Sequence, residues 1–305
     1  MKDNKLPEKL SDAELSEKLG HYQFIEALWS VFAILLVLAG IILIFVVHNL
    51  AVGGVLVFAS AAVGVFLAGG MQKKKKAFML QQMGDFFLSE LEKAFGKKKD
   101  IPDFTIDKQF FKASRLVDEC FEECRTENFY CGEHNGHTFS AVNAVLEHTF
   151  EERAGQDGWM THTETVFEGV VIRCKTNAAQ NACIWVNRKT EKQADIDIAY
   201  PAAFSLRFDV RAENEYDIPA YVTQEFREMM KNIETAAGGE LYGVTLCGGI
   251  LSLALGTKYV FAGIPLSLDA GNIDGIRKYY VDSLRNMGRI IDTIAKNTAL
   301  FGADE

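Results

Sequence analysis

Residues 27–70 read ALWSVFAILLVLAGIILIFVVHNLAVGGVLVFASAAVGVFLAGG and hold no Asp, Glu, Lys or Arg. A helix needs about 20 apolar residues to cross the hydrocarbon core of a bilayer. These 44 residues are interrupted near their middle by the polar pair His48-Asn49, so they fit two spans joined by a tight turn. Soluble helices normally keep a polar face, and this stretch has none. We therefore predict a transmembrane helical hairpin over residues 27–70.

Small residues in the second predicted span, Leu50 to Gly70, suggest how the two helices approach each other. Ser60, Gly64 and Ala68 recur at four-residue spacing, which places small side chains in one row along a helix and lets two membrane helices pack closely. The preceding tail, residues 1–26, carries four Lys against six acidic residues. A cleaved signal peptide would instead begin with a positively charged region.

A basic segment follows the apolar stretch directly. Residues 71–99 carry eight Lys against three acidic residues, and four of these lysines are consecutive: Lys73, Lys74, Lys75 and Lys76. The predicted turn at His48-Asn49 has no Lys or Arg, so the positive-inside bias makes the four lysines a topology anchor and places both termini in the cytoplasm. The same lysines are also able to contact anionic lipid headgroups. We expect a two-span membrane protein.

The rest of the chain divides into a juxtamembrane part and a domain. Residues 71–104 combine an amphipathic helix from Ala77 to Phe95 with a linker containing Gly96 and Pro102, and residues 105–305 form one cytoplasmic domain. Residues 100–305 carry twenty Lys and Arg against thirty-two acidic residues. Nucleic-acid binding needs a basic face to neutralise phosphates, so we expect no nucleic-acid partner.

Periodicity within the domain predicts an α+β fold. A period near 3.6 indicates helices over 106–125, after Thr223, and over 273–299. Asn135-Gly136 favours a tight hairpin turn, because both residues tolerate positive φ. We further expect a hairpin pairing Thr165–Lys175 with Cys183–Lys189, a strand over Phe204–Val210, and two strands around Gly248-Gly249. The expected architecture is a transmembrane hairpin followed by a mostly antiparallel sheet with packed helices.

The order of these features resembles a bacterial family of membrane-anchored proteins that is defined only as a domain of unknown function. The resemblance covers nearly the whole chain and rests on the hairpin and its lysines, then on short motifs: Tyr130-x-Gly132 with Gly136, Val166-Phe167-x-Gly169-Val170, the Phe204–Val210 segment and Tyr221-x-Thr223-x-x-Phe226. The family carries no established catalytic residues. Its genes lie beside those of LemA-type membrane proteins, so the resemblance implies a membrane-associated partner of that type. It also implies a two-span protein of the bacterial inner membrane.

One cluster of side chains has the chemistry of a metal site, because thiolate and imidazole are the ligands that tetrahedral zinc prefers. Its members are Cys120, Cys124, Cys131, His134 and His137. Cys120 and Cys124, four residues apart, would share one face of the predicted helix. The chain has no CxxC knuckle, and the alternative is that these are buried structural thiols and solvated turn histidines. Cys131 with His134 or His148 is also the minimum for nucleophilic catalysis.

The remaining motifs give no further chemistry. The chain has no GxxxxGK[ST] phosphate loop, and we expect no cofactor. Cys174 and Cys183 fall on the two strands of one predicted hairpin, where they would face each other as reduced thiols in a cytoplasmic domain.

These observations favour a non-enzymatic binding or scaffolding module that is held at the membrane and presents an acidic domain to the cytoplasm. The alternative is an enzyme or ligand sensor at the membrane face that uses the Cys/His cluster around Cys131 and His134. A protein partner in the membrane would support the binding module, and a convergent polar site in the domain would support the enzyme or sensor.

Overall fold

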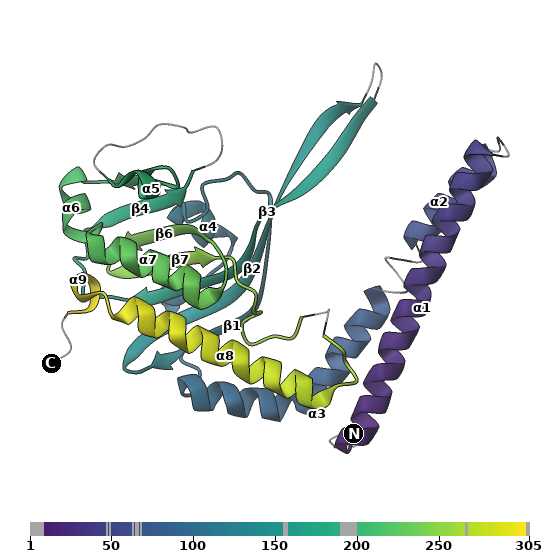
Figure 1. The fold of residues 1–305 in the computed structure, drawn as a ribbon, viewed down its shortest axis with the longest axis horizontal. Helices are drawn as coiled ribbons and strands as arrows, with labels where there is room; N and C mark the ends of the chain where they lie inside the picture. Colours follow the sequence, from purple (N-terminus) through teal and green to yellow (C-terminus); the bar gives the residue numbers. More distant parts are fainter. Residues whose placement is uncertain are drawn as a thin grey trace. The chain divides into compact units, whose positions relative to one another are not determined.

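A computed structural model describes residues 9–46, 48, 50–62, 64, 67, 69–154, 158–189, 200–265 and 268–302. The chain forms two compact units, Met1–Ser89 with Ile264–Tyr279 and Glu90–Gly263 with Tyr280–Glu305. Two helices, α3 and α8, contribute residues to both units (Figure 1).

The first unit is helical. Its helices are α1 (Asp12–Phe45), α2 (Leu50–Ala62), most of α3 (Gly69–Phe95) and the first turns of α8 (Ile273–Ala295). Ser11 caps α1: its hydroxyl accepts from the Glu14 amide, and the Glu14 carboxylate accepts in return from the Ser11 amide. This reciprocal capping satisfies backbone donors that have no partner within the helix.

Among the described residues, α1 alone is long and apolar enough to cross a membrane. Its apolar part from Ala27 to Phe45 rises roughly 28 Å at 1.5 Å per residue, close to the thickness of a hydrocarbon core. The predicted second span is not one continuous α-helix. The helix α2 has 13 residues, and Gly64 and Leu67 beyond it are π-helical. The structure thus shows one candidate span followed by a shorter apolar helix.

The helices α1 and α2 nevertheless pack closely, and glycines make the approach possible. A Cβ built on Gly53 would lie 2.7 Å from the Gly40 carbonyl oxygen, and one on Gly40 would lie 2.8 Å from that of Gly53. The predicted row of small residues does not make this contact. Ser60 is buried, but a Cβ on Gly64 would meet no atom within 4 Å, and Ala68 lies outside the described residues.

The second unit contains a seven-stranded sheet in which every pairing is antiparallel, in the order β1-β2-β3-β7-β6-β4-β5. The expected α+β class is therefore confirmed. The strands are β1 (Glu123–His134), β2 (His137–Ala154), β3 (Gly158–Lys175), β4 (Cys183–Arg188), β5 (Phe208–Ala212), β6 (Leu241–Cys247) and β7 (Ile250–Leu255). The remaining helices are η2 (Pro102–Phe104), α4 (Lys108–Ser114), α5 (Ala202–Ser205), η3 (Glu215–Asp217), α6 (Ile218–Tyr221), α7 (Gln224–Ala237) and α9 (Thr298–Phe301).

Side chains on both faces of the sheet are buried, so the sheet is the middle layer of the unit. Alternate residues of β2 show this: Val142, Ala144 and Leu146 belong to a core cluster with Phe111 of α4. Phe139, on the other face, packs against Phe95 at the end of α3, with ring centroids 5.0 Å apart. The helix α7 and the later turns of α8 are joined by the Asn286 side chain, which donates to the Ala236 carbonyl at 2.6 Å.

Local signals in the sequence predict several elements correctly. Thr223 caps α7 through a hydrogen bond from the Phe226 amide, and Gly238 ends the helix with φ of 63°. Asn135 and Gly136 both adopt positive φ in the β1–β2 turn, and Gly248-Gly249 joins β6 to β7. The terminal helix α8 starts at Ile273 as expected and ends at Ala295.

Three expectations about the domain are wrong. The helix predicted over 106–125 is only α4, because Arg115 takes a left-handed conformation that ends it, and β1 then starts at Glu123. The strands β3 and β4 do not form a hairpin: β3 lies between β2 and β7. The segment 204–210 is divided between α5 and β5, since the chain turns at Leu206 and Arg207.

The cysteine pairing also differs from the expectation. Cys183 lies opposite Cys247 across the β4–β6 pair and forms a disulfide with it, with Cα atoms 4.2 Å apart. Cys174 is a buried free thiol that lies opposite Leu251 of β7. Burial among apolar groups raises the pKa of this thiol to about 12, so it packs as a small hydrophobic residue.

Replacement Cys247→Ser is expected to lower the free energy of unfolding by about 4 kcal/mol, because the disulfide closes a loop across a sequence separation of 64. Urea unfolding of the full chain in detergent, followed by circular dichroism, measures the loss. Dithiothreitol should weaken the wild-type protein by the same amount and leave the variant unchanged. Cys120→Ser, at an exposed free thiol, is the control and should change nothing. A wild-type protein that is insensitive to reductant would contradict the prediction.

Candidate functional site

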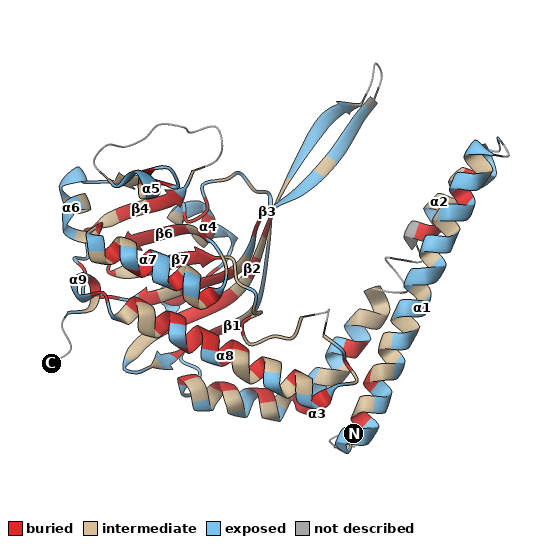
Figure 2. Ribbon diagram, viewed as in Figure 1, coloured by how far each residue is buried: buried red, intermediate tan, exposed pale blue. Residues whose placement is uncertain are grey.

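The first unit carries an exposed apolar belt on α1 and α2. Only 6% of the most apolar 18-residue window of α1 is buried, and Figure 2 shows this helix largely in the colours of exposed and intermediate residues. The exposed members on the two helices include Leu28, Phe32, Leu35, Leu38, Ile42, Phe45, Val55 and Phe58. Soluble proteins rarely leave so large an apolar patch in water. This surface suits the interior of a bilayer.

A polar cluster lies where the charge-free stretch begins and ends in the sequence. Glu26 is the last charged residue before the apolar stretch, and its carboxylate accepts from Lys75 Nζ at 2.7 Å and from Gln72 Nε2 at 2.8 Å. The side chains of Lys75 and Glu26 are only 10% and 16% exposed. Lys73, Lys74 and Lys76 are exposed. The four predicted anchor residues are therefore not equivalent: one is a buried ion-pair partner and three face outward.

Below this cluster α1 packs along α3. Tyr22 meets Phe78 edge to face with ring centroids 5.7 Å apart, and the Leu10 amide donates to Gln82 at 3.0 Å. The Tyr22–Phe78 contact lies on the polar part of α1, before the apolar stretch begins, and the Leu10 contact lies just before the helix starts at Asp12. They show that α1 continues as one helix from the polar tail into the apolar belt, with α3 as its neighbour.

A distant segment of the chain completes the first unit. Arg277 of α8 makes a bidentate ion pair with Asp12, at 2.7 and 2.8 Å, and this contact lowers the pKa of the Asp12 carboxyl. Ser16 and Gln23 bond the backbone of Gly271 and Ala270. The sequence alone gives no partner for this polar segment, and the structure joins Asp12, Ser16 and Gln23 to residues 270–277.

The predicted metal ligands do not gather into a site. Cys120 is exposed in a loop, Cys124 lies on β1 rather than on a helix, and Cys131 is fully buried. Among the described residues no group of three or more His, Cys, Asp or Glu is placed to hold a metal ion. The predicted helix face shared by Cys120 and Cys124 is wrong, because β1 begins at Glu123.

The histidines of the β1–β2 turn are held by other partners. His134 Nε2 lies 3.1 Å from the Asp292 carboxylate of α8, and its ring meets Phe95 edge to face. His137 lies opposite His134 across the turn, and its ring packs against Phe301. These two residues pack against α3, α8 and α9.

Cys131 is poorly placed for nucleophilic catalysis. Cys131 and His134 are three residues apart on one strand, so their side chains point to opposite faces of the sheet. Burial raises the pKa of the Cys131 thiol, and the thiol, unlike the thiolate, is a weak nucleophile. His148 contacts Glu122 instead, at 3.0 Å.

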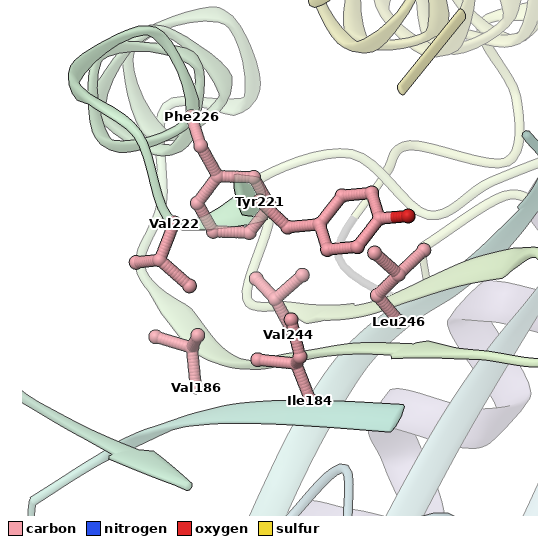
Figure 3. Close-up of a pocket in the computed structure, with 7 residues that line it drawn as sticks. All are labelled: Ile184, Val186, Tyr221, Val222, Phe226, Val244 and Leu246. Atoms are coloured by element: carbon pink, nitrogen blue, oxygen red, sulfur yellow. The ribbon is translucent and has the colours of Figure 1, made fainter. Parts of the chain in front are cut away.

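An apolar crevice lies between α6, α7 and the sheet (Figure 3). Seven residues line it: Ile184, Val186, Tyr221, Val222, Phe226, Val244 and Leu246. The crevice is too narrow to hold a water molecule. The Tyr221 hydroxyl accepts from the Ala179 amide at 3.0 Å. The crevice is therefore a packing seam in the core, and it lacks the convergent polar groups of a ligand pocket.

Comparisons with known proteins add little to these observations. No family model matches the chain, and no curated protein matches it. One solved structure, the crystal structure of the mycobacterial trehalose monomycolate transport factor A, TtfA, aligns over 69% of this chain and 95% of its own, with 10% sequence identity and a TM-score of 0.30. A likeness this weak supports no conclusion about fold or function.

Lys75→Met is expected to destabilise the helical unit by roughly 3 kcal/mol, because it leaves the Glu26 carboxylate buried without its cation. Lys74→Met is the matched control at an exposed position, with an expected change within about 0.5 kcal/mol. Thermal unfolding of the full chain in detergent gives both values. The double replacement Glu26→Gln with Lys75→Met should recover part of the loss. Equal effects of the two lysine replacements would contradict a structural ion pair.

Gly53→Val is expected to separate α1 from α2, because the added side chain would overlap Ile44 and the Gly40 carbonyl. Overpacking of this kind costs about 1 to 3 kcal/mol. Gly54→Val is the control, since a Cβ on Gly54 meets nothing within 4 Å. Thermal unfolding in detergent should show a lower melting temperature for the first variant alone. Identical melting curves would mean that the glycine contact does not form.

Proposed function

We propose that this protein is a two-span inner-membrane protein that presents its acidic α+β domain to the cytoplasm as a binding module. The observation that carries the membrane part is the apolar belt on α1 and α2, which the described residues of the chain leave exposed. The reading as a bacterial protein comes from the resemblance of its motif order to the family of membrane-anchored domains.

The Glu26–Lys75 pair supports two crossings rather than one. These residues flank the charge-free stretch on either side and are in contact. A chain that crossed the bilayer once would leave them on opposite sides, separated by about 30 Å of hydrocarbon. The contact favours a hairpin in which α2 and the residues that follow it return the chain to its starting side.

The lysines support a cytoplasmic side for the domain. Lys73, Lys74 and Lys76 are exposed just after the apolar stretch, as the positive-inside bias requires. The Cys183–Cys247 disulfide favours the opposite side, because disulfides are rare in reducing compartments. The exposed free thiol of Cys120 fits a reducing compartment better.

The acidic composition of the domain supports the binding role. With Cys131 buried and His134 on the opposite strand face, the alternative of an enzyme or sensor at this cluster has no supporting geometry. The resemblance suggests a LemA-type membrane protein as the partner. Co-purification of the tagged chain with such a protein, expressed in the same cell, tests this. A chain truncated before residue 105 should recover less of the LemA-type protein. Equal recovery by the two chains would mean that the domain does not take part in the interaction.

Labelling with a membrane-impermeant maleimide tests the topology in intact spheroplasts. His48→Cys, in a chain with Cys120→Ser and Cys124→Ser, is expected to react from outside, because the turn between the spans lies there. The native Cys120 should react only after permeabilisation. Labelling of Cys120 in intact spheroplasts would place the domain outside. Protection of both positions until permeabilisation would exclude the two-span hairpin.

A further inference from the structure

The strands β2 and β3 continue beyond the rest of the sheet as a two-stranded arm (Figure 1). The pairing of β1 with β2 reaches only Glu147, and the pairing of β3 with β7 starts only at Val170. From the His148–Glu164 pair to the Ala154–Gly158 pair, the two strands have no other strand beside them among the described residues. The arm therefore has two open edges.

An isolated two-stranded ribbon is marginally stable in water, and this one buries little of its apolar surface. Trp159 is 71% exposed and Met160 is 54% exposed. Within the arm, the rings of His148, Phe150 and His162 stack on one face, with Phe150 and His162 centroids 5.6 Å apart at 26°. On the other face the hydroxyls of Thr149 and Thr163 are 3.2 Å apart.

The two edges of the arm differ in charge. The β2 edge carries Glu151, Glu152 and Arg153 in succession, and charged side chains of this kind normally protect an open edge from pairing. The β3 edge over residues 159–165 reads WMTHTET and has a single charged residue, Glu164. Trp and Thr are residues that favour strands. The β3 edge is thus suited to accept another strand, and the β2 edge is not.

We propose that the β3 edge of the arm pairs antiparallel with the same edge of a second copy of this chain. A two-fold axis at His162, the midpoint of residues 159–165, places Thr161 opposite the partner's Thr163 and Trp159 opposite the partner's Thr165. Such an interface is self-complementary, as two-fold symmetry demands. The two arms then form one four-stranded sheet, and each chain keeps its own seven-stranded sheet.

The charges of the β3 edge are compatible with pairing to a second copy of the same edge. In the symmetric pairing, Glu164 lies opposite the partner's Met160, so no like charges face each other. Glu164 is also diagonal to the partner's His162, and Thr161 is able to bond the partner's Thr163; both are favourable cross-strand pairs. The stack of Phe150 on His162 extends across the axis to the partner's His162, which covers apolar surface that one arm alone leaves in water.

Cysteine cross-linking of the full-length protein in detergent tests the proposal directly. The variant His162→Cys, in a chain with Cys120→Ser and Cys124→Ser, places two thiols on the axis and is expected to form an intermolecular disulfide under mild oxidation. Glu151→Cys, on the charged β2 edge of the same arm, is the matched control and should cross-link at least tenfold more slowly. Equal or faster cross-linking of the control would overturn the proposal.

Mass measurement by light scattering gives a second readout that does not depend on cross-linking. The wild-type protein should have twice the 33.9 kDa mass of one chain, and His162→Lys, which sets two ammonium groups against each other on the axis, should lose that dimer. Glu151→Lys adds the same side chain to the other edge and should leave the dimer intact. A wild-type monomer, or a dimer that survives His162→Lys, would overturn the proposal, and membrane topology would be unaffected in either case.

Discussion

A helix whose apolar side chains are mostly uncovered is unstable in water, and this constraint determines the organisation of the first unit. In α1 the charge-free part leaves its large side chains uncovered, and α2 covers only one strip of it, where Gly40 and Gly53 let the backbones touch. Burial of apolar surface in a bilayer satisfies the side chains, and the helical backbone satisfies its own hydrogen bonds. The polar groups at the base, Glu26, Gln72 and Lys75, then satisfy one another.

The second unit buries its apolar side chains without a membrane, because helices of the same chain cover its sheet. Both faces of β2 are buried, one against α4 and the other against the end of α3. Strands that are covered on both faces do not need an alternation of polar and apolar residues. Where the cover ends, as in the arm beyond Glu147, charged and hydroxyl side chains return and every described side chain is exposed or half-buried. The boundary of the core is thus visible along a single strand.

Local chemistry in the sequence was enough to predict α7, the Asn135-Gly136 turn and the β6–β7 turn, because each depends on residues within a few positions. The strand order was beyond it: β3 lies beside β7, whose residues are about 80 positions away, and only tertiary packing selects that neighbour. The helix predicted over 106–125 was wrong because apolar spacing continues past Arg115, where the backbone turns. Four consecutive lysines are enough to predict a topology anchor. The ion pair of Lys75 with Glu26 is not predictable, because a single acidic residue before an apolar stretch does not by itself indicate a partner.

The ion pair between Asp12 and Arg277 joins residues that are 265 positions apart. A ribosome adds roughly 5 to 20 residues per second, so Arg277 is made on the order of tens of seconds after Asp12. α1 and α3 are made early in that interval, but their contacts with α8 cannot form before its end. The seam on α1 that includes Asp12, Ser16 and Gln23 therefore lacks its partners Ala270, Gly271 and Arg277 until those residues have been made.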